Sequence, residues 1–297
     1  MNLLCCINND YTLPLLNLLC SIRKYNNDKI CLYILTTNLN SKSQNKILQV
    51  CQKLNINCNI KNVTLNKDMY SCKHYSVDMY LRLFAFDLLP ADVEKVLYLD
   101  VDTIVCDDIK KLYDINIDSN LLAAVCDRIY EKEEPLSDLD NDWLEYIKNQ
   151  NIDHKYINSG VLLLNLKNIR RNWNVKKLEE CIASTIRTQC PDQDVLNKLL
   201  KNTDLKELED RFNYYIKHED KVEKIDSPVI IHYIGRIKPW NTYRLNKWEK
   251  LWWQIPDQKL IGKCYVGRKR LHFCLKRANE DFCAKLKRGF NKLLKRK

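Results

Sequence analysis

The chain has 297 residues, of which 45% are apolar and only five are glycine. This apolar share is sufficient for a packed core, so the composition excludes a disordered chain. Only three glycines precede residue 263, which excludes the glycine-rich phosphate loops of P-loop NTPases, kinases and dinucleotide-binding proteins.

The net charge of +11 is concentrated at the C-terminal end of the chain. Residues 263–297 contain thirteen Lys or Arg and two acidic residues, which leaves 36 basic and 36 acidic residues in 1–262. Because residues 1–262 carry no net charge, they are not expected to bind nucleic acid, whereas the basic segment 263–297 indicates an anionic partner for that segment. We therefore expect two parts, a domain at 1–262 and a basic tail at 263–297.

The fourteen cysteines do not form a metal-binding pattern, because no two of them are separated by two residues. Most lie in apolar runs, so we expect reduced, buried thiols. The N-terminus has no basic segment ahead of its apolar start, and no run of 18 apolar residues occurs. These features predict a cytoplasmic protein without a signal peptide or a transmembrane helix.

In chain order, short apolar runs alternate with amphipathic stretches. The runs predict strands at Leu3–Ile7, Ile30–Thr36, Ile56–Val63, Val96–Leu99, Leu121–Val125, Tyr156–Leu164 and Val229–Tyr233. The stretches predict helices at Leu13–Lys24, Ser41–Leu54, Tyr75–Leu89, Val175–Thr188 and Gln193–Lys201. This alternation predicts an α/β fold with a Rossmann-like, mostly parallel sheet flanked by helices. Ligands bind such sheets beyond the carboxyl ends of the strands, and the charged stretch 128–154 is expected to form a long loop over the site.

The strand predicted at Val96–Leu99 leads directly into Asp100, Val101 and Asp102. Residues two apart on a strand share a face, so both carboxylates can reach one ion. Carboxylate oxygens are ligands for Mg²⁺ or Mn²⁺, and such sites complete their shell with phosphate oxygens. The pattern alone is weak, because solvated acids at the end of a strand have the same spacing.

A haloacid-dehalogenase-like phosphatase also begins with a hydrophobic strand and Asp-x-Asp. In that interpretation Asp100 is the nucleophile and Asp102 the acid. That fold requires its motif early in the core and a later Gly-Asp pair. This chain has no Gly-Asp pair, and about ninety residues of alternating structure precede Asp100. The sequence therefore disfavours the phosphatase.

Three later stretches carry polar groups at the ends of predicted elements. Residues 156–166 (YINSGVLLLNL) place an asparagine and a glycine at the head of a buried strand. Residues 191–197 (PDQDVLN) open a helix, and residues 230–240 (IIHYIGRIKPW) end a strand on histidine before a glycine and a lysine. In this order, together with Asp-x-Asp, they resemble glycosyltransferase family 8, which includes glycogenin and bacterial lipopolysaccharide α-galactosyl- and α-glucosyltransferases. The resemblance runs from Leu3 to about Trp252 and implies a GT-A fold.

The resemblance also implies a UDP-sugar donor and a divalent cation, Mn²⁺ or Mg²⁺, between the protein and the diphosphate. Asp100, Asp102 and His232 match the metal ligands, and an imidazole beside two carboxylates favours Mn²⁺. Asp192 and Gln193 match the catalytic positions, with Gln193 nearest the β face of the anomeric carbon. Together with Asp127 and Asn158, they match positions that hold the sugar hydroxyls. The other positions that match donor contacts are Cys6, Asn8, Asp10, Tyr11, His74, Arg82, Val101, Asp127, Asn158, Gly235 and Lys238.

The N-terminal motif departs from the family pattern. Many members have Asp-Asp-Asn-Tyr where this chain has Asn8, Asn9, Asp10 and Tyr11. An asparagine carbonyl can still accept from the uracil N–H, and a carboxylate can bind the ribose hydroxyls. UDP therefore remains the expected nucleotide.

The expected activity is retaining transfer of galactose or glucose to a glycan or glycolipid acceptor, such as lipopolysaccharide or another bacterial surface glycan. Gln193 is a neutral amide and a poor nucleophile, which favours front-face attack over a covalent glycosyl-enzyme. Two alternatives remain open. One is a non-catalytic UDP-sugar-binding protein, and the other is a membrane-docked scaffold.

The basic tail contains an apolar stripe with spacings of three or four residues, as on one face of a helix. Its members are Leu271, Leu275, Ala278, Phe282, Leu286, Phe290 and Leu293. A basic amphipathic helix is expected to lie on an anionic membrane surface, here the inner face of the cytoplasmic membrane. The alternative is a helix packed on the domain with its basic face in solvent.

Overall fold

The computed structural model describes residues 1–64, 77–127, 145, 147–150, 152–185, 188, 190–216, 227–235, 237–242, 246–255 and 258–294. The strands are β1 Asn2–Cys6, β2 Ile30–Thr36, β3 Ile56–Asn62, β4 Lys95–Leu99, β5 Thr103–Val105, β6 Leu122–Cys126, β7 Ile157–Asn165, β8 Leu205–Leu208, β9 Tyr214–Ile216 and β10 Ile230–Tyr233. The α-helices are α1 Thr12–Tyr25, α2 Ser41–Lys53, α4 Ala85–Leu88, α5 Lys110–Tyr113, α8 Leu166–Asn172, α9 Val175–Thr185, α10 Pro191–Leu199, α11 Lys247–Gln254, α12 Gln258–Ile261 and α13 Lys263–Leu294. The described residues also contain four 3₁₀ helices: η1 Asn9–Tyr11, η2 Val77–Phe84, η3 Asn202–Asp204 and η4 Asp210–Phe212.

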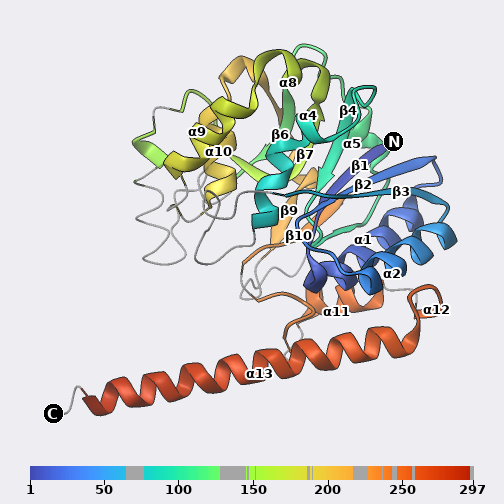
Figure 1. Cartoon of the computed structure of the whole chain (residues 1–297), viewed down its shortest axis with the longest axis vertical. Helices are drawn as coiled ribbons and strands as arrows, with labels where there is room; N and C mark the ends of the chain where they lie inside the picture. Colours follow the sequence, from blue (N-terminus) through green and yellow to red (C-terminus); the bar gives the residue numbers. More distant parts are fainter. Residues whose placement is uncertain are drawn as a thin grey trace.

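The main sheet has seven strands in the order β3-β2-β1-β4-β7-β6-β8. All neighbours in it are parallel except at β7, which runs antiparallel to both β4 and β6. A second sheet has the order β5-β10-β9 and lies beside the first (Figure 1). The predicted α/β fold with a mostly parallel sheet is confirmed.

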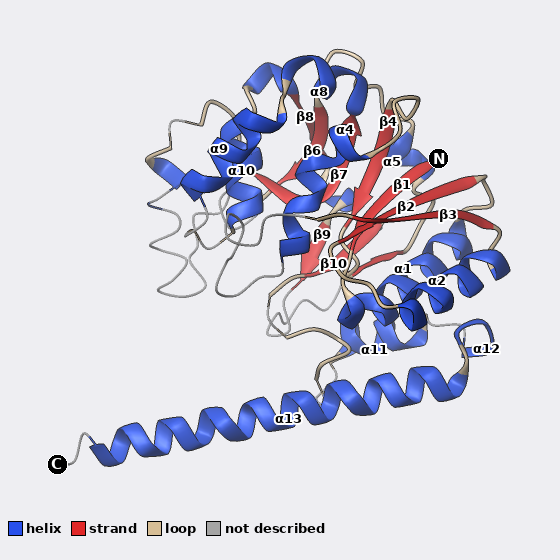
Figure 2. Cartoon of the chain, in the orientation of Figure 1, coloured by secondary structure: helices blue, strands red, loops and turns tan. Residues whose placement is uncertain are grey.

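The core lies on both faces of the main sheet, as the alternation of side chains along a strand requires. Leu3 and Leu97 belong to the apolar cluster that includes residues of α1 and α2. Leu4 and Tyr98, their neighbours in sequence, belong to the opposite cluster, which includes residues of η2, α8 and α10. Figure 2 shows these helices as two layers with the strands between them. The sheet is therefore covered on both faces.

The segment before β4 differs from its prediction. In place of an α-helix over Tyr75–Leu89, residues 77–84 form the 3₁₀ helix η2, followed by the single turn α4; Tyr75 lies outside the described residues. Asp78 accepts hydrogen bonds from the backbone N–H and hydroxyl of Thr37 at 2.7 and 2.9 Å. Arg82 is held by Asp100, 3.0 Å away. Asp78, near the start of η2, and Arg82, near its end, both contact residues that are distant in sequence. These tertiary contacts outweigh the preference of the segment for an α-helix.

The last helix, α13, begins directly after Gly262, whose φ of +95° breaks the chain direction. It runs along one side of the body below α11 and extends past it toward the C-terminus (Figure 1). Val266 and Phe273 from its first half are buried in the core. No helix in the described part of the chain has the length and apolar character needed to cross a bilayer.

Candidate functional site

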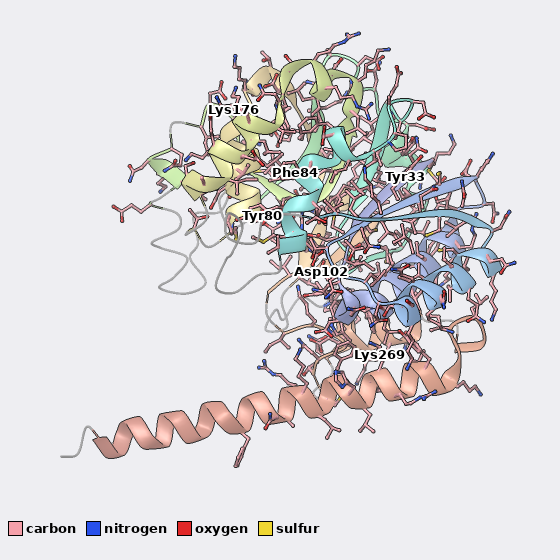
Figure 3. The ribbon with its side chains drawn as sticks, viewed as in Figure 1. Tyr33, Tyr80, Phe84, Asp102, Lys176 and Lys269 are labelled. Atoms are coloured by element: carbon pink, nitrogen blue, oxygen red, sulfur yellow. The ribbon has the colours of Figure 1, made fainter. Side chains whose placement is uncertain are left out.

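The topology brings the ends of several strands to one edge of the main sheet. The strands β1, β4 and β6 are parallel, so the residues that follow them, among them Asn8, Asp100 and Asp127, meet at that edge. Because β7 is antiparallel, it contributes its beginning, with Asn158 and Gly160, to the same edge. Figure 3 shows Asp102 near the centre of the molecule. The described candidate residues therefore converge from separate parts of the sequence.

A tight turn from Asp100 to Thr103 orients the carboxylates of Asp100 and Asp102. The carbonyl of Asp100 accepts from the N–H and the hydroxyl of Thr103, at 3.2 and 2.6 Å. Val101 is 6% exposed inside this turn. Directly after it, β5 pairs antiparallel with β10 and sets His232 opposite Thr103. The turn and the strand pair together bring His232 beside Asp100 and Asp102.

Asp100, Asp102 and His232 form a candidate metal cluster. One ligand atom from each lies within 4.8 Å of the others. His232 Nε2 is 3.2 Å from Asp102 Oδ1 and 4.0 Å from Asp100 Oδ2. Asp102 Oδ1 is buried and has no hydrogen-bond partner among the described residues, although it faces this nitrogen. An orphaned carboxylate oxygen beside a second carboxylate and an imidazole suits a divalent cation.

Gly160 makes room for this cluster. A Cβ at this position would lie 2.2 Å from His232 Cε1, 2.8 Å from His232 Nδ1 and 3.0 Å from Asp100 Oδ2. Any side chain would therefore displace the imidazole ring. The glycine in the motif at 156–166 is required by the close approach of His232, which enters from a different sheet.

Each carboxylate also has a cationic neighbour. Arg82 approaches Asp100 at 3.0 and 3.2 Å, and Tyr98 donates to Asp100 at 2.5 Å. Burial nevertheless raises the pKa of Asp100 above its ordinary value. Burial acts on Asp102 in the same direction, but Lys238 and His232 outweigh it and hold the pKa of Asp102 well below its usual range. Asp102 is therefore the more firmly ionised of the two.

Lys238 connects the cluster to the loop after β10. Its ammonium lies 2.6 Å from Asp102 Oδ2 and 2.6 Å from the carbonyl of Tyr233. Its backbone N–H donates to Asn241 Oδ1 at 2.7 Å. Gly235 lies between β10 and Lys238 with a φ of +82°, a left-handed conformation that favours glycine. The turn at Gly235 brings the lysine back over the carboxylates.

A second group of polar side chains lies beside the cluster. Gln193 Nε2 donates to Asp127 Oδ2 at 3.2 Å, and Gln193 Oε1 accepts from the Ser159 N–H at 3.0 Å. Asn158 donates to the same Asp127 oxygen at 3.3 Å. Asp192 accepts from the Ser159 hydroxyl at 3.0 Å and lies 3.5 Å from Arg82. The structure thus joins all four predicted sugar-contact residues (Asp127, Asn158, Asp192 and Gln193) in one buried hydrogen-bonded network.

The N-terminal candidates lie on the other side of the cluster. Asn8 Oδ1 caps η1 by accepting from the Asp10 N–H at 3.0 Å. Asp10 is half exposed and lies 3.3 Å from Lys276 on α13. Burial, together with the charges of Asp102 and Asp100, raises the pKa of Tyr11 to about 12. Cys6 ends β1 and is partly exposed.

One predicted site residue, His74, lies outside the described residues, as does most of the predicted loop at 128–154. The structure adds four residues that sequence reasoning missed: Tyr98, Ser159, Asn213 and Tyr215. Ser159 could have been found, because it lies between Asn158 and Gly160 in the same motif. Asn213 and Tyr215 sit in a stretch without a distinctive spacing. Tyr215 lies in β9 and Asn213 directly before it, and the pairing of β9 with β10 places them beside His232.

Comparisons with known proteins agree with this arrangement. The family model described as "Glycosyl transferase family 8" matches residues 2–243. The chain is 34% identical over 200 residues to a lipopolysaccharide 1,2-glucosyltransferase of Escherichia coli K12, covering 61% of this chain and 55% of that protein. It is 27% identical over 261 residues to the glycosyltransferase GlyF of Streptococcus pneumoniae, covering 84% of this chain and 59% of that protein. The chain spans little more than half the length of these relatives.

Solved structures share the fold. The galactosyltransferase LgtC, in complex with donor and acceptor sugar analogues, superposes with a TM-score of 0.70 at 23% identity, covering 86% of this chain and 95% of LgtC. The glycosyltransferase GlyE of Streptococcus pneumoniae superposes with a TM-score of 0.66 at 20% identity, covering 90% of this chain and 64% of GlyE. The predicted GT-A fold is confirmed.

Proposed function

Because the chain belongs to glycosyltransferase family 8, we propose that it is a retaining hexosyltransferase that transfers galactose or glucose from a UDP-sugar to a glycan acceptor. One observation carries this proposal. The cluster of Asp100, Asp102 and His232 lies directly beside the buried hydrogen-bonded network of Asp127 and Gln193. Side by side, the two could hold a diphosphate through a cation and a sugar through its hydroxyls.

Asp100, Asp102 and His232 are the residues that would hold the cation, and the mixed oxygen and nitrogen ligands favour Mn²⁺ over Mg²⁺. When bound, a divalent cation neutralises charge that develops on a diphosphate leaving group. Lys238 already lies against Asp102 and would turn its ammonium to the phosphates. No general acid is then needed to release UDP.

Arg82 has a supporting role in this proposal. It is 8% exposed and contacts Asp100, Asp192 and the carbonyl of Ser159. A guanidinium that reaches two carboxylates at once keeps them apart and oriented. Arg82 would thus fix the position of Asp100, a proposed cation ligand, relative to Asp192, a proposed sugar contact.

The chemistry follows from the neutral side chain at position 193. We assign Asp127, Asn158 and Asp192 to the hexose hydroxyls and Gln193 to the anomeric centre. The acceptor oxygen bonds to the anomeric carbon on the face from which UDP departs. The bond from that carbon to UDP breaks, and the acceptor proton passes to the departing β-phosphate oxygen. The Gln193 amide stabilises the positive charge at the carbon without forming a bond to it.

The acceptor is inferred from the relatives and the tail. The Escherichia coli relative is named as a lipopolysaccharide glucosyltransferase, which supports a surface-glycan or glycolipid acceptor. Leu271, Leu275 and Phe282 are about 60% exposed on α13, so this part of the predicted stripe does not pack on the domain. An exposed apolar stripe among basic residues favours docking at an anionic membrane surface, with the domain on the cytoplasmic side.

A panel of UDP-sugars tests the proposal. The full chain is incubated with Mn²⁺ and each of UDP-galactose, UDP-glucose, UDP-N-acetylglucosamine and UDP-glucuronate, without acceptor, and UDP release is measured. Slow hydrolysis of UDP-galactose or UDP-glucose, abolished by EDTA and restored by Mn²⁺, is the expected result. Tight UDP-sugar binding without hydrolysis of any donor would instead identify a non-catalytic binding protein.

A further inference from the structure

Asn213 is buried between the candidate metal cluster and the hydrogen-bonded network of Asp127, Asn158 and Gln193. Its side chain is 0% exposed. Asn213 Oδ1 lies 3.0 Å from His232 Nδ1, and Asn213 Nδ2 lies 2.9 Å from Asn158 Oδ1. It therefore touches the ring nitrogen of His232 that faces away from the carboxylates.

The direction of these hydrogen bonds follows from groups that cannot reverse their roles. The backbone N–H of Gly160 can only donate, and it donates to Asn158 Oδ1 at 3.0 Å. Asn158 Nδ2 is then the donor of that amide, and it donates to Asp127 Oδ2 at 3.3 Å. The amide of Asn158 therefore has one possible orientation. This matters because amide orientations are otherwise assigned rather than observed.

The orientation of Asn158 determines the next two groups. Because Asn158 Oδ1 is an acceptor, Asn213 must present its NH₂ group to it, and the carbonyl of Asn213 then faces His232. A carbonyl only accepts, so His232 Nδ1 must carry a proton. When the ring is neutral, its lone pair is on Nε2, the nitrogen 3.2 Å from Asp102 and 4.0 Å from Asp100.

We propose that Asn213 is a positioning residue that fixes the tautomer of His232, so that Nε2 is kept free for the cation. A chain of hydrogen bonds runs from Asp127 through Asn158 and Asn213 to His232 in the candidate metal cluster. Tyr215 supports its start by donating to the other oxygen of Asp127 at 3.1 Å. The role toward the cation rests on the proposed function, whereas the tautomer itself does not.

The ring orientation is fixed from two sides. Asn213 holds Nδ1, and the ring fills the space beside Gly160 that a Cβ would occupy. Partners that orient a metal-ligating histidine in this way set both its tautomer and its basicity, and their loss costs about ten- to hundredfold in metal affinity. A merely structural buried amide would affect stability but not metal affinity.

The first test is the tautomer, measured without metal or nucleotide. The chain has five histidines, so ¹⁵N-histidine labelling gives a simple spectrum, and the His232→Gln variant assigns the signals of His232. At about pH 9, well above the ordinary histidine pKa, the remaining ring proton of His232 is expected on Nδ1. A proton on Nε2 would overturn the inference.

The second test is the affinity for Mn²⁺ in the presence of UDP, measured by electron paramagnetic resonance. Asn213→Ala should weaken Mn²⁺ binding by about ten- to hundredfold. Asn17→Ala is the matched control, because Asn17 is an equally buried asparagine that donates to the carbonyl of Trp252. Equal affinity of wild type and Asn213→Ala would refute the positioning role. A wild-type chain that binds no Mn²⁺ would refute the proposed function and leave the tautomer result standing.

Discussion

Gly160 shows how a single residue limits the geometry of the candidate metal cluster. The space that its missing Cβ leaves is filled by the ring of His232, and the next side chain in that space is Asp100. Asn213 Oδ1 lies 3.0 Å from Nδ1 of the same ring. The imidazole therefore cannot move away without losing a buried hydrogen bond.

We predict that Gly160→Ala disables the cluster. A methyl group 2.2 Å from His232 Cε1 forces the ring out of place, and overpacking of this kind costs about 1–3 kcal/mol. Metal-dependent UDP release should fall at least about tenfold. Gly267→Ala is the control, because no atom of the described residues lies within 4 Å of a Cβ added there. Gly160→Ala with wild-type activity would contradict the geometry.

For the Gln193→Ala variant we predict a fall in kcat of the size expected when one electrostatic contact is removed. Gln193→Ala removes the amide that bridges Asp127 and the Ser159 N–H, so kcat should fall by about 10²–10³ without loss of folding. Mass spectrometry of the wild-type chain with its donor should show no covalent sugar. A glycosyl group trapped on Gln193 or Asp192 would contradict front-face attack.

Residues were predictable from sequence where a motif carried them. Asp100 and Asp102 follow a buried strand, and His232 ends another, so residue type and position together identified them. Asn213 and Tyr215 had no such signal. Their contacts with His232 and Asp127 depend on β9 pairing in register with β10, and no local spacing encodes that pairing.

At the scale of elements, long periodic segments were predictable and short ones were not. β2 lies over Ile30–Thr36, as predicted, and α2 ends one residue before its predicted end. β5 and β9 have three residues each, too few for a period to emerge. The 3₁₀ conformation of η2 follows from contacts of Asp78 and Arg82 with residues distant in sequence. Helix propensity depends on local sequence alone and therefore could not predict it.

The helix α13 carries the prediction about the membrane. A triple variant, with Gln in place of Leu271, Leu275 and Phe282, should bind anionic vesicles at least about tenfold more weakly. Each of these apolar side chains contributes about 1.5–3 kcal/mol when it is fully buried. Hydrolysis of the UDP-sugar should stay unchanged. These substitutions are preferable to deletion of 263–297, because α13 also contributes Val266 and Phe273 to the core.

Leu48→Gln is the matched control for this experiment, because Leu48 is an exposed leucine on α2 and is not part of the apolar stripe. Binding should also weaken with salt, since the charge contribution of the basic residues is screened. Vesicle binding that is the same for wild type and the triple variant would show that the exposed stripe does not contact lipid.

At the scale of the whole molecule, the antiparallel strand β7 is the feature that completes the site. Its insertion between β4 and β6 brings Asn158, Ser159 and Gly160 to the edge where the parallel strands end. The alternating pattern predicted the sheet and its ligand-binding edge. It did not predict the strand order, because the pairing of β4 with β7 joins residues 62 to 70 positions apart in sequence.

The central claim is that Asp100, Asp102 and His232 bind the diphosphate of UDP through a divalent cation. Calorimetric titration of the full chain with UDP, in Mn²⁺ and in excess EDTA, tests it most directly. UDP should bind with Mn²⁺ and lose at least about tenfold in affinity without it, and Asp102→Ala should bind weakly in both conditions. Equal UDP affinity in Mn²⁺ and in EDTA, or full affinity in Asp102→Ala, would contradict the claim.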